Sequence, residues 1–207
     1  MNLWYNHRIV IDELEYTWSG FMNKCLPGTT LSIGENEFDS PFSKIKPMFA
    51  LGGLTLSQVR ELTGLESSTI QNWVKRGWVS APIEKKYYER HVSRIIIINM
   101  LRGALKLEKI AELMQYINGE VESADDDCIS DGELYDILCS IVLQLEQMND
   151  YSDETIWRLI TQQLKDYRGP FEDSSERMAM TLSIMVRAYI ATLFRTKAET
   201  LLDNILQ

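Results

Sequence analysis

Two short helix patterns separated by a glycine constrain the fold of this 207-residue chain more than any other feature. The first pattern begins at Thr55. Thr followed three residues later by Gln58 can form two reciprocal hydrogen bonds between side chain and backbone at a helix start. Gly64 stands where this helix would end, because glycine adopts the left-handed conformation of a helix end without steric penalty. The pattern predicts a helix of about two turns.

The second pattern follows at once. Ser67 and Ser68 provide its start, with Gln71 three residues after Ser68, and Gly77 provides its end. Two short helices joined by a tight turn that contains glycine are the sequence form of a helix-turn-helix. Residues 78–86 then form an extended, proline-containing segment that is long enough for a small wing.

The second predicted helix and the wing carry side chains of the types that contact DNA. Hydroxyl and amide groups reach base edges in the major groove, and Lys and Arg contact phosphates. We therefore expect a base-reading set and a phosphate-binding set. The first is Ser68, Thr69, Gln71, Asn72 and Lys75, and the second is Arg76, Lys85 and Lys86.

Several neighbouring residues have a simpler structural interpretation. Trp73, Trp78 and Tyr87 are expected to pack in the core rather than to stack on bases. We expect His91, near a predicted helix start, to be a capping or packing residue rather than a ligand. The alternative for the cations at the end of the second helix is a solvated helix end, where positive charge favours the helix dipole.

Charge is distributed unevenly along the chain. The net charge of −9 argues against nucleic acid as a partner when the whole sequence is considered. Residues 54–118, however, carry ten Lys or Arg against six Asp or Glu, whereas residues 119–207 carry seven against eighteen. Positive charge is therefore concentrated where the helix-turn-helix pattern lies, as phosphate binding requires. The surplus is small, so we expect weak non-specific affinity for DNA.

Apolar spacing predicts helices over most of the remaining chain. Four consecutive isoleucines at 95–98 favour a strand when taken alone, but both flanks have helical spacing, so we expect a helix over 89–102. The last helix is apolar on most sides through its middle, which indicates a buried central helix. The other predicted helices span 4–24, 107–117, 133–148 and 153–167, and the last spans 174–205.

The sequence thus predicts a mainly α protein with four segments. Residues 1–53 form an N-terminal helix and an irregular connector, and residues 54–118 form the winged helix-turn-helix domain. Residues 119–132 are an acidic linker and the expected domain boundary. Residues 133–207 form a helical bundle, which we expect to provide a dimer contact or to enclose a small-molecule effector. Within it, apolar residues of the helix over 133–148 repeat at alternating spacings of four and three.

The residues at 69–114 resemble the head of the MerR family of regulators. TIQNWVKRGWV at 69–79 resembles the end of that family's recognition helix, KKYYERHV at 85–92 its wing exit, and LKLEKIAELM at 105–114 the second helix of its following pair. Gln71 departs from the pattern, because an Arg that contacts phosphate is common there. The resemblance implies a winged helix-turn-helix that binds duplex DNA.

A second resemblance is to an uncharacterised bacterial family known only as a domain of unknown function. It is similar in an Asn-aromatic-Val-Lys helix end at 72–75 and in a Lys-Lys-Tyr segment at 85–87 followed by His91. We expect this similarity to cover roughly residues 4–117. It implies a DNA-binding regulator with no biochemical activity attached.

Other classes of function find little support in the sequence. No phosphate-binding Gly loop, nucleophile elbow or HExxH zinc motif is present, so we expect neither an enzyme nor a cofactor. The three cysteines and two histidines lack metal-binding spacing, and we expect free thiols and no metal. The longest apolar stretch, at 178–194, is short and interrupted by polar residues, so we expect a cytoplasmic protein without a membrane span.

We therefore predict a transcriptional regulator that binds duplex DNA, most simply as a homodimer. The alternative is a protein-interaction adaptor that kept the winged fold and lost DNA binding. The acidic balance and Gln71 favour that alternative. It predicts a partner that docks on the surface of Trp73 and Trp78.

Overall fold

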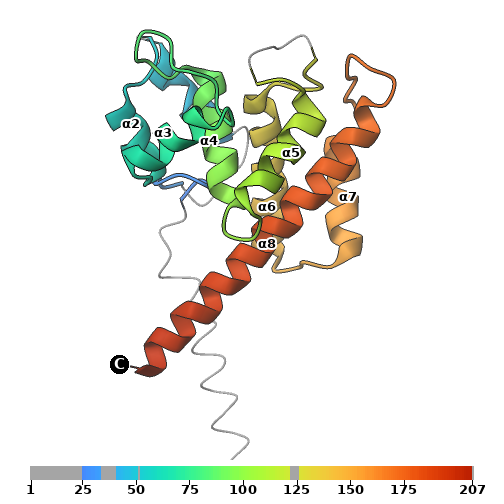
Figure 1. Cartoon of the computed structure of the whole chain (residues 1–207). Helices are drawn as coiled ribbons and strands as arrows, with labels where there is room; N and C mark the ends of the chain where they lie inside the picture. Colours follow the sequence, from blue (N-terminus) through green and yellow to red (C-terminus); the bar gives the residue numbers. More distant parts are fainter. Residues whose placement is uncertain (1–24, 34–40, 51, 122–125, 207) are drawn as a thin grey trace, which may run out of the picture.

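The chain folds around a central helix that contains the four isoleucines (Figure 1). A computed structural model describes residues 25–33, 41–50, 52–121 and 126–206, so the helix predicted over 4–24 lies outside the described residues. Within them the protein is mainly helical and contains no strand longer than an isolated β-bridge. The elements are η1 (Pro41–Lys44), η2 (Lys46–Phe49), α2 (Leu56–Thr63), α3 (Ser67–Lys75), α4 (Glu89–Leu101), α5 (Leu107–Asn118), α6 (Asp131–Met148), α7 (Asp153–Gln163) and α8 (Ser174–Leu206).

α4 confirms the choice of helix for the isoleucine run. Ile95, Ile96, Ile97 and Ile98 are all buried, because α4 is covered on different sides by α2, α5, α6 and α8. A helix that is apolar on every side is stable only when neighbours surround it, and here they outweigh the β preference of branched side chains. α5 also agrees with the prediction, since the face that contains Ile110, Leu113, Met114 and Ile117 is buried.

A buried ion pair joins the middle of α4 to the first residue of α6. Asp131 accepts hydrogen bonds from Nε and Nη2 of Arg94 at 2.7 and 3.1 Å, and from Nδ2 of Asn118 at 3.0 Å. Both charged side chains are less than 5 % exposed. α6 begins at Asp131, two residues earlier than predicted, because Ser130 and Glu133 form reciprocal capping hydrogen bonds. One continuous core connects the helices before and after the predicted linker.

The connector packs against α4 and α6 through a few specific bonds. The hydroxyl of Tyr135 donates to the carbonyl of Pro27 at 2.9 Å, and Asn99 donates to the carbonyls of Gly28 and Thr63. Gly28 has a φ of +75°, and a Cβ there would lie 2.7 Å from the carbonyl oxygen of Ile96. Only glycine fits this approach, so the connector is fixed against α4.

α7 and α8 differ from their predicted forms. α7 ends at Gln163 rather than near Tyr167. α8 is a buried central helix only in its first half, where the buried residues lie between Ser174 and Ala188. Its second half extends away from the other helices (Figure 1). The prediction of a buried central helix is therefore confirmed for the first half of α8 alone, because apolar content around a helix does not reveal how far its neighbours reach.

α8 also has the length and composition of a membrane-spanning helix. Among the described residues it is the one helix with an 18-residue window of mean hydropathy 1.2, and 39 % of that window is buried inside the protein. Buried core helices of water-soluble proteins meet the same criterion. The prediction that the chain has no membrane span stays a prediction.

Candidate nucleic-acid interface

The first of the two short helices forms as the sequence predicts. Thr55 accepts a hydrogen bond from the backbone of Gln58, and the Gln58 side chain accepts one from the backbone of Thr55. Gly64 ends α2 with a φ of +68°, in the left-handed region. α2 and α3 then pack against each other across this turn. The capping pair and the glycine therefore fix where α3 begins.

α3 begins at Ser67, as predicted, but its capping differs from the prediction. Glu66 is the N-cap and makes no side-chain capping bond, so the predicted pairing of Ser68 with Gln71 is wrong. Leu65 and Ile70 are both buried and stand at the two positions of a hydrophobic staple, one before the cap and one on the first turn. Their burial places the N-cap at Glu66, one residue before the serines. Ser68 thereby lies inside the helix with its side chain exposed.

α3 presents an exposed polar ridge. Ser68, Gln71, Asn72 and Lys75 are exposed and follow one another at spacings of three, one and three, which places them on one face of the helix. Ile70 and Trp73 on the opposite face are no more than 1 % exposed and belong to the core. The expected core position of Trp73 is confirmed. The ridge therefore lies on a helix whose opposite face is packed in the core, and not on a loop.

Two of the predicted contact residues occupy less open positions. Thr69 is half-buried beside the ridge. Arg76 follows the end of α3, where its Nη1 lies 3.4 Å from a carboxylate oxygen of Glu108 on α5. Its guanidinium also lies over the ring of Trp78, at 5.1 Å from the ring centroid. Trp78 itself is half-buried against the core. Arg76 therefore has partners within the chain, although its side chain is 52 % exposed.

The segment predicted as a wing forms a two-residue β-turn. Ile83 and Lys86 exchange two backbone hydrogen bonds, and the residues between them, Glu84 and Lys85, have φ values of +49° and +62°. These are positions that Asn and Gly usually occupy in tight hairpins. The side chain of Lys85 is exposed at the turn, whereas that of Lys86 is half-buried. A non-glycine residue in this conformation costs about 1–2 kcal/mol, and such strain is common at functional sites.

Histidine and tyrosine hold both ends of this wing. Nδ1 of His91 accepts a hydrogen bond from the backbone of Tyr88 at 2.9 Å, so Nε2 is free to donate to the carbonyl of Ala81 at 3.0 Å. Tyr87 is buried, and its backbone pairs with that of Leu54 just before α2. The capping and packing roles predicted for these residues are confirmed. The wing is therefore attached both to α4 and to the start of α2.

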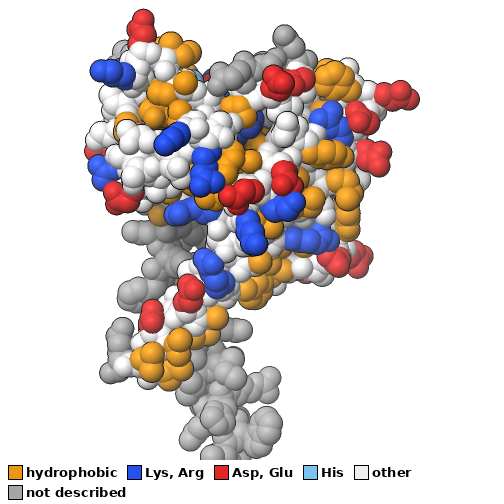
Figure 2. Space-filling model, in the orientation of Figure 1, with side chains coloured by type: hydrophobic (Ala, Val, Ile, Leu, Met, Phe, Trp, Pro, Cys, Tyr) orange, Lys and Arg blue, Asp and Glu red, His pale blue; other side chains and the backbone are white. Residues whose placement is uncertain are grey.

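The surface of this lobe carries cations that are mixed with carboxylates. Figure 2 shows Lys and Arg side chains over the lobe that contains α2 and α3, with Asp and Glu at its edges. Glu84 is exposed beside Lys85, and Glu66 is exposed at the start of α3. The lobe therefore carries exposed charges of both signs, in agreement with the small surplus of positive charge in residues 54–118 of the sequence.

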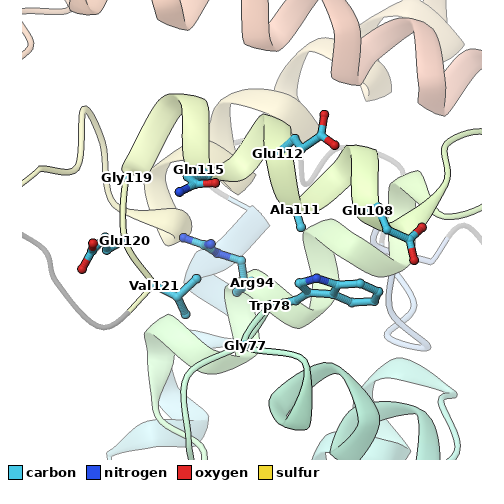
Figure 3. A pocket seen from close by; sticks show the side chains of 10 residues that line it. All are labelled: Gly77, Trp78, Arg94, Glu108, Ala111, Glu112, Gln115, Gly119, Glu120 and Val121. Carbon is cyan, nitrogen blue, oxygen red and sulfur yellow. The ribbon is translucent and has the colours of Figure 1, made fainter.

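A cavity of about 530 Å³ lies between the end of α3 and α5 (Figure 3). Trp78 forms one wall, Arg94 lies at its base, and Glu108 and Glu112 come from α5. Most of these charges are already engaged within the chain. Arg94 is bound to Asp131, and Glu112 accepts from Lys109 at 2.6 Å. We assign the cavity no ligand.

Sequence reasoning missed several features of this site. Nothing in the pair Glu84 and Lys85 indicates a left-handed turn, because both residue types avoid that conformation. Ile83, which is 59 % exposed and pairs with Lys86 across the turn, was also missed, although an apolar residue two positions before a basic pair was a visible signal. The pairing of Arg76 with Glu108 joins residues 32 positions apart, and no short motif reveals it.

The residues of the candidate site lie in a segment that matches one family model. No curated protein and no solved structure matches the chain. A family model described as "Domain of unknown function (DUF1836)" matches residues 48–138. The similarity expected over residues 4–117 therefore begins later and ends later, since the match runs into the first half of α6. The part of the chain that carries α2, α3, the wing, α4 and α5 is similar to this family of unknown function.

Proposed function

We propose that the protein binds duplex DNA through a MerR-like winged helix-turn-helix and regulates transcription. The observation that carries this proposal is the ridge on α3, where Ser68, Gln71, Asn72 and Lys75 are exposed above a buried base. A major groove about 12 Å wide admits an α-helix, and a rigid helix with polar residues at this spacing suits such a groove. The basic wing beside it adds phosphate contacts.

Base recognition is assigned to the ridge. Asn and Gln form two simultaneous hydrogen bonds with adenine, Lys pairs with guanine, and hydroxyl groups contact any base. Asn72 and Gln71 are therefore the residues that select sequence, with Lys75 one turn further along. Ser68 and the half-buried Thr69 lie at the start of α3, which is the end of a recognition helix that usually contacts base edges.

Phosphate binding is assigned to the wing and to the end of α3. Lys85 is exposed at the tip of the wing, and Lys86 is next to it. Arg76 contributes if its contact with Glu108 opens, and an exposed pair of this kind is worth no more than about 1 kcal/mol. With these three cations on phosphates, a plot of the logarithm of the binding constant against the logarithm of the salt concentration should have a slope of about −3 per winged helix-turn-helix domain.

The remaining parts of the proposal concern partners and place. Recognition helices of this type usually act in pairs on two half-sites, so we propose a homodimer. The acidic surface of residues 119–207 would orient the head on DNA by repulsion. The proposed regulator is cytoplasmic, and an effector in the C-terminal region would give it a signal to respond to.

A protein-interaction adaptor is the second candidate. The pairing of Arg76 with Glu108 and the net charge of −9 favour it, because both lower the attraction for phosphate. The expected docking surface of Trp73 and Trp78 is only partly accessible, because Trp73 is buried. Only the half-buried Trp78 is available for such a contact.

Selection from a random pool of duplex DNA tests the proposal. The full chain is incubated with the pool, and the bound fraction is sequenced over several rounds. We expect one enriched motif, which Asn72→Ala relaxes at one or two positions at a cost of about 1–3 kcal/mol per base. Gln162→Ala on the exposed surface of α7 is the matched control and should leave the motif unchanged. A pool that stays random for the wild-type chain would favour the adaptor.

A further inference from the structure

α8 carries an exposed apolar seam along most of its length. Eight of its positions are separated alternately by four and three residues, which is the repeat of a coiled-coil face. All of them except Arg187 are apolar, and all except Arg187 are exposed. The α8 seam consists of Met180, Ile184, Arg187, Ala191, Phe194, Ala198, Leu201 and Ile205.

The described residues cover only part of this seam: the ring of Tyr151 lies edge-on against Phe194, at 5.2 Å between centroids, and Asp153 pairs with Arg187. The core side of α8 is a different face, which buries Met178, Leu182 and Met185. Met180 is 48 % exposed, Phe194 49 % and Ile205 77 %. Together with Leu202, Leu206 and Trp157, which are also exposed, the surface amounts to on the order of 800 Å². One partner of a standard protein interface buries about the same area.

We propose that the α8 seam binds the α8 seam of a second copy of this chain in an antiparallel pair. A two-fold axis between Thr192 and Leu193 brings every seam residue opposite another seam residue. Met180 then faces Ile205 of the second copy, and Ile184 faces Leu201. Near the axis, the pairs are Arg187 with Ala198 and Ala191 with Phe194. The contact is the same on both copies, so it closes as a dimer.

The sizes of the residues favour the antiparallel direction. In the antiparallel register, the small Ala191 and Ala198 each face a large side chain, so the interface fills evenly. In a parallel register, each alanine would face the same alanine of the second copy, and Phe194 would face Phe194 of the second copy. Such an interface would have cavities at the alanines and overpacked contacts at Phe194, and both lower its stability.

Charge favours the same direction. Arg187 is paired with Asp153 of its own chain at 2.6 Å; a parallel pair would still place two such arginines side by side, whereas the antiparallel register brings Arg187 level with Glu199 of the second copy. Glu199 is exposed and lies 3.6 Å from Arg195 of its own helix. Arg187 also lies beside Trp157, at 6.0 Å from the ring centroid, so the exposed indole borders the proposed interface. Arg and Trp are the residue types enriched where interfaces are strongest.

Sedimentation of the full chain tests self-association without any DNA, so its outcome is separate from that of the proposed function. We expect a dimer at micromolar concentration. Leu201→Lys combined with Ile205→Lys should raise the dissociation constant by more than about 100-fold, since the two-fold symmetry would place four lysines in apolar contacts of the seam. Thr196→Lys combined with Thr200→Lys adds the same charge on the outer face of α8 and should leave the dimer intact.

A distance measurement tests the direction of the pair. Spin labels at Asp203→Cys, with exposed Cys25 changed to Ser, report the separation of the two labels in the dimer. The antiparallel register predicts about 30 Å along the helix axis, because each label lies about ten residues from the two-fold axis. A separation below about 20 Å would mean a parallel pair and would overturn the proposed register.

Other outcomes would overturn the proposal itself. A wild-type chain that is monomeric, or a dimer that survives the two lysines in the seam, would show that the seam does not bind a second copy. If a chain without residues 1–24 dimerised while the full chain did not, the first residues would be the occupant. Flotation of the wild-type chain with lipid vesicles, lost in the lysine variant, would identify a lipid surface instead.

Discussion

The buried pair of Arg94 and Asp131 makes a prediction that can be worked out from the structure. Asp131→Ala removes three hydrogen bonds and leaves the Arg94 guanidinium with its charge uncompensated at less than 5 % exposure. Breaking a buried pair on one side costs about 3–5 kcal/mol, because the remaining charge stays out of water. For a chain of this length, such a loss lowers the melting temperature by roughly 6–20 °C.

Urea unfolding, followed by circular dichroism, measures this cost, with Glu108→Ala as the control. Glu108 belongs to an exposed ion pair, so its removal should cost no more than about 1 kcal/mol. The double variant Arg94→Met with Asp131→Leu should lose much less than Asp131→Ala, because neither charge remains buried. If Asp131→Ala cost as little as Glu108→Ala, the pair would not be buried as described, and the reasoning would be refuted.

Three further predictions concern the wing and the thiols. Glu84→Asn should stabilise the protein by up to about 1 kcal/mol, because Asn tolerates the left-handed conformation better, and an unchanged urea midpoint would argue against strain there. His91→Phe should lower the free energy of unfolding by about 1–3 kcal/mol, because both hydrogen bonds of His91 to the wing are lost. It should also speed amide hydrogen exchange in residues 81–88. An unchanged exchange rate would exclude this anchoring role. Only Cys25 among the three thiols should react with a disulfide reagent in the native state, because Cys128 and Cys139 are buried. Burial also raises the pKa of the Cys139 thiol, which disfavours the reactive thiolate. Rapid reaction of all three thiols would contradict the fold.

Local signals in the sequence were sufficient for the helices near the candidate site. The pair Thr55 and Gln58 and the glycines at 64 and 77 act within four residues of where they stand, so the backbone follows from them directly. The helix around the isoleucines was also predictable, since its flanks have helical spacing. Such features depend on neighbours in the chain and not on the tertiary structure.

Features that depend on distant partners could not be predicted. The contact of Arg76 with Glu108 and that of Arg94 with Asp131 join residues more than 30 positions apart. The buried fraction of α8 depends on where α6 and α7 end, and the position of the α3 N-cap depends on the burial of Leu65. In each case packing, rather than local preference, decides the outcome.

The most direct test of the proposed function is the affinity of the full chain for random-sequence duplex DNA across a salt series. The account predicts binding at low salt that falls with a log–log slope of about −3 per head. Replacing Lys85 and Lys86 with Ala should weaken binding to all sequences and bring the slope close to −1. As a control, Lys165→Ala, at an exposed position just after α7, should change neither the affinity nor the slope. No binding at the lowest salt, or a slope unaffected by the wing lysines, would contradict the account.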